Sequence, residues 1–218
     1  MADDGYAISR DRGVKIAAIV AGVVALLFLV SQLAIPPIVE DEVAERLTEN
    51  GGSADVDVSA FPALRLLGSD GKRIEVRARD LRIDLERPDP KAFEKLDGFG
   101  EVDVRVVGSR AGPFRIERFS IERDGGGDDY AVEMTGAVTG EELASYAGEQ
   151  VGGPLGRFLG GAAGNAIPGG ESEIPIQVDL DLSSNGGRPE FESGGGTVAG
   201  IPLDPLVEIV AQAIVERL

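Results

Sequence analysis

The strongest constraint in the sequence is an uncharged apolar run from Ile16 to Ile35. It reads IAAIVAGVVALLFLVSQLAI, and as a helix it would span about 30 Å, the thickness of a bilayer's hydrocarbon core. A buried core helix is seldom this long and apolar on every face, so the run predicts a transmembrane helix. The alternative is a cleaved signal peptide. The run is longer than the usual apolar region of such a peptide, and Pro36-Pro37 follows it in place of a small-residue cleavage site.

The charges on either side of this run predict its orientation. Basic residues precede it and acidic residues follow it, namely Arg10, Arg12 and Lys15 against Glu40, Asp41, Glu42 and Glu45. The positive-inside rule then places residues 1–15 in the cytoplasm, residues 16–35 in the cell membrane and residues 36–218 outside the cytoplasm. With either an uncleaved anchor or a signal peptide, the domain is expected to be exported.

Composition excludes several kinds of chemistry. The chain has no Cys and no His, which removes disulfides, thiol nucleophiles, Ser-His-Asp catalysis and nearly every zinc site. Its net charge is −17, and residues 1–15 contribute none of the excess. An acidic domain is repelled by nucleic acid and by anionic lipid surfaces, so we expect no nucleic-acid partner. No cofactor is expected either.

Alternating apolar and charged residues predict about seven strands after the apolar run. In the second of them the apolar phase moves from Ile74, Val76 and Ala78 to Leu81, Ile83 and Leu85, so one extra residue is expected near Asp80. The same slip lies between Ile116 and Phe119. Such extra residues are β-bulges, which increase strand twist. The pattern predicts a long, curved, mostly antiparallel sheet with one charged face.

Helices are expected at the two ends of the domain and at two places between. Apolar spacing predicts a short amphipathic helix over 38–47, separated from the transmembrane helix by Pro36-Pro37, which should end or kink it. Asp89-Pro90 can open a short helix to Leu96, and Thr139 with Glu142 forms a capping box. Asp204-Pro205 opens a C-terminal helix with one apolar stripe. The predicted class is therefore α+β, an anchor followed by a sheet wrapped on helices.

No sequence motif indicates catalysis. Asp55/Asp57 and Asp179/Asp181 resemble D-x-D metal motifs, but alternate acids on a strand are better interpreted as its solvent face. No G-x-S-x-G and no P-loop is present. We therefore expect no enzyme activity, no catalytic residue and no metal site, and a carboxylate-dependent hydrolase or transferase ranks last among the alternatives.

The segment 151–168 is unusually rich in glycine and carries Arg157 as its only charge. One interpretation is a lid or membrane-touching lip at a cavity mouth, with Leu155, Phe158 and Leu159 as its apolar contacts. The other is a flexible glycine loop, which Pro154 favours because it interrupts a continuous helix.

Residues 56–86, VDVSAFPALRLLGSDGKRIEVRARDLRIDLE, resemble the LmeA-like phospholipid-binding family of actinobacterial envelope proteins. The family pattern there is V-x-V-x-G-F-P-x-L, then a Gly and a long strand; Phe61, Pro62, Leu64 and Gly68 match it, and Ala60 replaces the usual Gly. Residues 130–136, the start of the 139–143 helix and 200–203 are similar to later family blocks. The resemblance implies a tubular lipid-binding type of fold, with a sheet curled round a helix and an apolar tunnel for acyl chains.

A tunnel of this kind needs apolar walls more than polar groups, because burial is worth about 0.8 kcal/mol per CH₂. The expected function is an anchored protein that binds phospholipid or a related envelope lipid and serves envelope lipid or lipoglycan maintenance. The alternative is an anchored, non-catalytic scaffold of the cell envelope. For each wall candidate an ordinary core role is equally compatible with the sequence. These candidates are Phe61, Leu64, Ile74, Val76, Leu81, Ile83, Phe114, Ile116, Phe119, Val132, Met134, Ile176, Val178 and Leu180.

Overall fold

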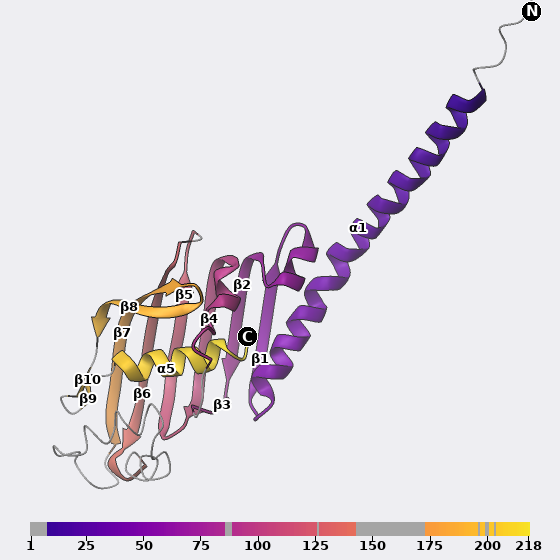
Figure 1. The fold of residues 1–218 in the computed structure, drawn as a ribbon. Helices are drawn as coiled ribbons and strands as arrows, with labels where there is room; N and C mark the ends of the chain where they lie inside the picture. The colour runs from indigo at the N-terminus through magenta and orange to yellow at the C-terminus, as the bar shows by residue number, and fades with distance from the viewer. Residues whose placement is uncertain are drawn as a thin grey trace, which may run out of the picture.

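The computed structural model describes residues 8–85, 89–125, 127–142, 173–195, 197–198, 201–202 and 204–218. A long N-terminal helix, α1, leads into a sheet whose inner face is covered by shorter helices (Figure 1). The chain is therefore α+β, as the sequence predicts, with a large mixed sheet of eight strands.

Helix α1 runs without a break from Ile8 to Thr48 and has Pro36 and Pro37 inside it. The prediction of a separate helix over 38–47 was wrong in this respect. Each proline removes one backbone hydrogen bond, which ordinarily ends or bends a helix. Here the residues after the prolines are held against the domain, so tertiary packing outweighs the local penalty. In the described part of the chain, α1 is the one helix long and apolar enough to cross a membrane.

The C-terminal end of α1 belongs to the core of the domain. Val43 and Leu47 are buried there and pack with the sheet. The carboxylate of Glu40 accepts a hydrogen bond of 3.1 Å from the backbone N–H of Val58, on the first strand. Since that strand lies at the edge of the sheet, α1 satisfies one of the backbone donors that this edge would otherwise leave free.

The main sheet has the order β1-β2-β4-β5-β6-β7-β8, with the short β3 also paired to β4. All pairs are antiparallel except β2–β4 and β3–β4, which are parallel. A crossover that includes the short helix α2 (Glu94–Asp97) makes this parallel pairing possible. The strands are β1 Ser53–Ser59, β2 Gly71–Arg79, β3 Arg82–Ile83, β4 Phe99–Ala111, β5 Phe114–Arg123, β6 Asp129–Thr139, β7 Glu173–Asn185 and β8 Arg188–Gly195.

Both predicted slips in the apolar phase are present, and they form one line across the sheet. Asp80 has a left-handed backbone, with φ of 57°, and it falls opposite Gly108 of β4, whose φ is 60°. Gly108 in turn falls opposite Glu117 of β5. Because each of these neighbouring strands carries one extra residue at the same level, the pairing register between them is unchanged. We call the line Asp80–Gly108–Glu117 the crease.

The crease ends between β5 and β6. There the register shifts between Ile116 and Arg118, so the extra residue of β5 becomes a β-bulge against a regular β6. Gly136 of β6 lies beside this bulge, paired with Ile116. A Cβ atom placed on Gly136 would lie 2.3 Å from the backbone oxygen of Arg115, so the two strands approach more closely there than any side chain permits.

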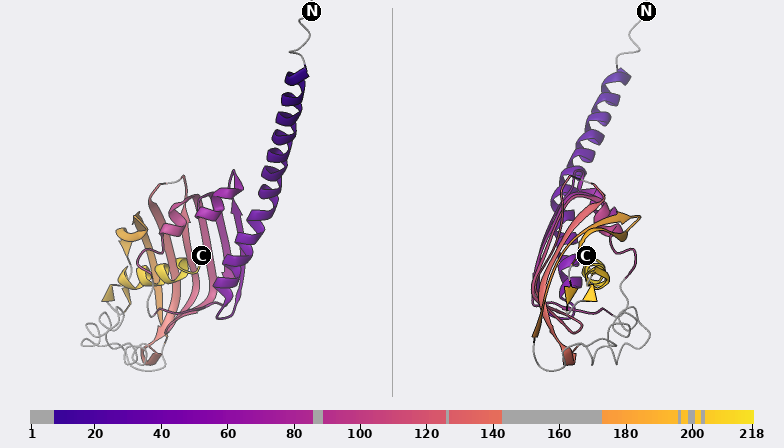
Figure 2. Two further views of the ribbon diagram at one scale, coloured as in Figure 1. Left: turned by 45° about the vertical axis from the view of Figure 1, so that its right-hand side comes forward. Right: turned by 90° about the vertical axis from the view of Figure 1, so that its left-hand side faces the viewer.

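Short helices and the C-terminal helix cover the inner face of the sheet. Figure 2 shows the sheet curving around α5 (Asp204–Val215), which lies on its concave side. The 3₁₀ helix η1 (Ala63–Gly68) joins β1 to β2. A small second sheet pairs β9 (Thr197–Val198) with β10 (Ile201–Pro202). The capping box is confirmed: the Glu142 N–H donates to Thr139 Oγ1 at 3.1 Å, and Glu142 Oε2 accepts from the Thr139 N–H at 3.3 Å.

The close approach at the bulge yields a test of the fold. We predict that Gly136→Ala lowers the free energy of unfolding by about 1–3 kcal/mol, because the added methyl group meets backbone atoms that cannot rotate away. Gly68→Ala is the matched control: nothing lies within 4 Å of its Cβ position, so a change between zero and a gain of about 1 kcal/mol is expected. Urea unfolding of the full chain in detergent micelles, followed by circular dichroism, measures both. Equal stability of the two variants would contradict the described packing at the bulge.

Candidate functional site

The sequence-predicted wall residues lie together on the inner face of the sheet, with two exceptions. All of them except Phe61 and Leu64 are buried, and they belong to one apolar core that also contains buried residues of α5. Val76, Phe119, Val132 and Leu180 are completely inaccessible to solvent. The inner face is therefore mostly apolar from β1 to β7, and its described part is covered by protein.

Phe61 and Leu64 lie outside this core, on the surface of the segment that connects β1 to β2 along the chain. Helix η1 turns Ala63 and Leu66 inward and leaves Leu64 and Leu67 facing out. The ring of Phe61 contacts Phe28 of α1 edge-on, with centroids 5.6 Å apart. The predicted lid residues Leu155, Phe158 and Leu159 lie outside the described residues.

An apolar pocket lies where α1, η1 and the inner face meet. Its volume is about 80 Å³. Ile74 is the predicted wall residue that lines it, beside side chains from α1, η1 and α2 and from the C-terminal residue. The full lining is Val39, Val43, Arg46, Val58, Leu66, Ser69, Ile74, Lys95, Leu96, Phe99 and Leu218. The pocket thus forms at the position where α1 changes from a helix exposed on all sides to one packed on the domain.

Two cations border this apolar pocket. Arg46 pairs with Glu42 one helical turn earlier, and the ammonium group of Lys95 donates to the backbone carbonyl oxygen of Glu216. Burial lowers the pKa of Lys95 below its ordinary value of 10.5, and the neighbouring charge of Arg46 lowers it further. Two like charges thus border one apolar cavity, where Glu42 neutralises Arg46 and the acids Glu216 and Asp89 lie near Lys95.

A second, polar depression of about 530 Å³ lies near the β5–β6 hairpin. It is lined mostly by acids and hydroxyl-bearing residues, among them Glu122, Asp129, Asp181 and Ser193. Asp181 accepts a hydrogen bond of 2.6 Å from the hydroxyl group of Ser193. All four aspartates of the D-x-D pairs are exposed, as expected for a solvent face, and the described residues contain no acidic cluster able to hold a metal ion.

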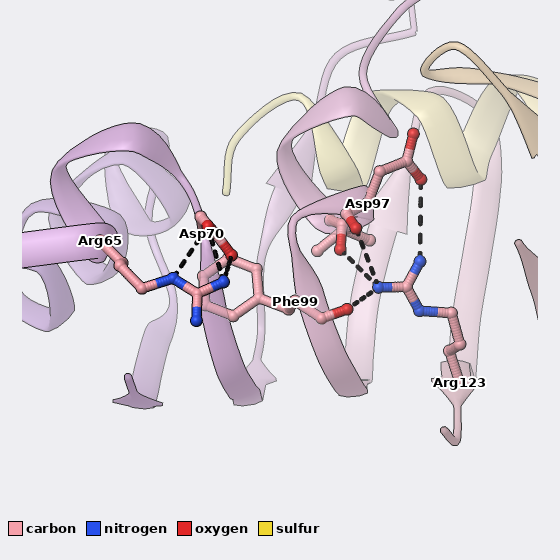
Figure 3. Close-up of polar contacts among 6 residues, drawn as sticks. Arg65, Asp70, Asp97, Phe99 and Arg123 are labelled. Carbon is pink, nitrogen blue, oxygen red and sulfur yellow. Dashed lines mark hydrogen bonds and ion pairs between the residues drawn. The ribbon is translucent and has the colours of Figure 1, made fainter. Parts of the chain in front are cut away.

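A buried polar cluster fixes α2 on the sheet (Figure 3). Arg123 is 4% exposed and donates to the hydroxyl oxygen of Tyr130 at 2.7 Å and to the backbone oxygens of Leu96 and Phe99. The Tyr130 hydroxyl then donates to Asp97 at 2.8 Å. Burial raises the pKa of Tyr130 far above its ordinary value, so the phenol stays protonated and keeps this hydrogen bond.

Sequence reasoning missed both the buried cluster and the cations of the pocket. A signal for the first existed: Arg123 follows Phe119 and Ile121 in the inward register, where a charge needs buried partners. Arg46 and Lys95 carry no such signal, because their proximity depends on how two distant helices pack.

Comparisons of the chain with protein-family models, with curated proteins and with solved structures find no match.

The polar cluster gives a second prediction. Tyr130→Phe should lower the free energy of unfolding by about 1–3 kcal/mol, because it leaves a buried guanidinium N–H and a carboxylate without their shared partner. Arg105→Gln serves as the control: its ion pairs with Asp103 and Glu122 lie on the exposed face, where such pairs contribute less than about 1 kcal/mol. Chemical unfolding of both variants checks this. A Tyr130→Phe protein as stable as Arg105→Gln would show that the cluster is not what holds α2.

Proposed function

We propose that the chain is a single-pass protein of the cell membrane whose extracytoplasmic domain binds a phospholipid or a related envelope lipid. Its role would be cell-envelope lipid or lipoglycan maintenance, without catalysis. The observation that carries the proposal is the apolar pocket with two basic groups at the junction of α1 and the domain. A lipid that left the outer leaflet beside the helix would meet this pocket first.

The proposed orientation follows from charge. The basic residues before the apolar run remain in the cytoplasm, and the acidic residues after it remain outside. The pocket-lining residue Val39 follows Ile35 by one helical turn, so this orientation places the pocket about 6 Å beyond the hydrocarbon core. At this level a bound lipid could keep its phosphate in water while its chain entered the domain.

Both parts of a phospholipid have a matching group in this site. Val43, Leu66 and Ile74 offer apolar surface to an acyl chain, and each buried CH₂ contributes about 0.8 kcal/mol. Arg46 and Lys95 offer charge to the phosphate. The pocket is smaller than the roughly 300–1,000 Å³ of common ligand sites, so the proposal requires η1 or α1 to separate from the sheet when a full chain enters.

Photo-crosslinking of the full chain in vesicles tests the proposal. With a lipid that carries a diazirine on its acyl chain, we predict adducts on the pocket residues Val39, Val43, Leu66 and Ile74, besides those on the apolar run of α1. Val43→Phe should abolish the pocket adducts by filling the cavity and leave the others unchanged, which makes the run an internal control. Peptide mapping by mass spectrometry reads both. Adducts confined to the apolar run would refute lipid binding by the domain, but they would still support the proposed membrane anchoring by α1.

The lowered pKa of Lys95 predicts a pH dependence. The ammonium group attracts a phosphate only while protonated, so pocket adducts with phosphatidylglycerol should decline as pH rises through the folded-state pKa, below 10.5. Lys95→Gln should weaken the labelling several-fold and remove this decline. Lys91→Gln, the same charge change at an exposed position, should do neither. A pH profile that Lys95→Gln leaves unaltered would assign phosphate recognition to other groups.

The close packing of the inner face favours a second candidate, an anchored scaffold. Along most of β4 to β7 the apolar side chains meet one another and α5, and the opposite face carries ion pairs such as Arg73–Glu75 and Arg105–Asp103. A scaffold needs a firm core and a charged outer surface. Crosslinking that captured one protein partner and left the pocket free of lipid adducts would favour this candidate.

A further inference from the structure

The surface beside α1 carries a compact group of exposed apolar side chains. Phe61 is 74% exposed, Leu64 53% and Leu67 70%. In the described part of the chain, the other large apolar residues exposed outside α1 are Val107 and Phe191, which lie on separate strands. We call Phe61, Leu64 and Leu67 the apolar tip.

The apolar tip lies against the part of α1 that is expected to be inside the bilayer. The edge-on contact between Phe61 and Phe28 fixes its level along the helix, and η1 lies beside α1 in Figure 1. Phe28 precedes Ile35, the end of the apolar run, by seven residues, or about 10 Å along a helix. Apolar faces of interfacial helices are buried about 5–10 Å into the boundary of headgroups and acyl chains, so the apolar tip reaches at least that depth.

The charges next to the apolar tip neutralise each other. The guanidinium group of Arg65 donates through Nε and through Nη2 to the carboxylate of Asp70, at 2.9 Å and 2.6 Å (Figure 3). Ser69 closes η1 with its N–H bonded to the Leu66 carbonyl oxygen. A segment with a paired charge can approach hydrocarbon at a smaller penalty than one with a lone charge.

We propose that the apolar tip inserts into the outer leaflet of the bilayer that α1 crosses, as a second membrane contact. This inference rests on the proposed anchoring. The rest of the domain is acidic and is repelled by anionic headgroups, so the contact must be apolar. Two attachment points fix the rotation of the domain about α1, and they keep the pocket, whose wall includes Leu66 of η1, at the lipid surface.

The absence of cysteine permits a direct test on the full chain. Single cysteines would replace Leu67, Val107 or Leu27, each labelled with an environment-sensitive fluorophore, in phosphatidylcholine vesicles that contain nitroxide-labelled lipid. Val107 is the matched control, an exposed apolar residue on the outer face of β4, and Leu27 reports on the anchor. We expect lipid nitroxides to quench the label at Leu67 several-fold more than the one at Val107, and aqueous iodide to quench it several-fold less.

The other outcomes separate this inference from the proposed function. If the label at Leu67 is as open to iodide as the label at Val107 while Leu27 is protected, the apolar tip does not insert into the bilayer. The proposed anchoring by α1 would still stand. A label at Leu67 that neither quencher reaches also overturns the insertion, because the side chain is then covered by protein. A label at Leu27 open to iodide overturns the anchoring itself. A Leu67→Asp variant should lose lipid quenching of a label at position 64, which confirms the contact without reliance on one probe site.

Discussion

The unbroken course of α1 is the constraint on which the rest of the structure depends. One helix supplies the apolar run from Ile16 to Ile35 and then, within four turns, the buried residues Val43 and Leu47. Because a continuous helix is rigid, the packing of its last turns on the sheet fixes how the domain lies with respect to the apolar run. The position of η1 beside Phe28 and the pocket lined by Leu66 both follow from this arrangement.

The crease explains how long strands keep one apolar face inward on a curved sheet. A β-bulge adds one residue to a strand and bends it, and a bulge in one strand alone disturbs the pairing with its neighbours. Asp80, Gly108 and Glu117 each add their residue at the same level, so β2 to β5 bend as one unit. The pairing register shifts only between β5 and β6, where the absence of a side chain at Gly136 allows the two strands to approach closely.

The sequence predicted the crease in part, because only some of its strands carry strongly apolar residues on both sides of it. Leu81 and Ile83 reveal the slip at Asp80, and Phe119 and Ile121 reveal the one in β5. In β4 the residues after Gly108 that turn inward are Ser109 and Ala111, which are too weakly apolar to reveal the change of phase. The parallel pairing of β2 with β4 is a long-range property that periodicity does not encode.

The candidate site was less predictable than the fold for similar reasons. Ile74 could be assigned to an inner wall from its register, whereas Phe61 and Leu64 belong to a family-like motif outside the strands, where no register shows which way a side chain faces. A 3₁₀ helix separates them from the core, and its own residues divide between inside and outside. The continuity of α1 through Pro36 and Pro37 likewise depends on packing, which local propensity does not contain.

The hydrogen bond between Glu40 and the Val58 N–H gives α1 a protective role. Proteolytic release of the domain by cleavage before residue 40 would keep the carboxylate that accepts from this N–H, whereas cleavage just after residue 40 would remove it and leave this donor of the β1 edge free. Exposed edges recruit further strands and lead to aggregation. The position of a cut in α1, over a few residues, would thus change how well this edge is protected from pairing with another chain.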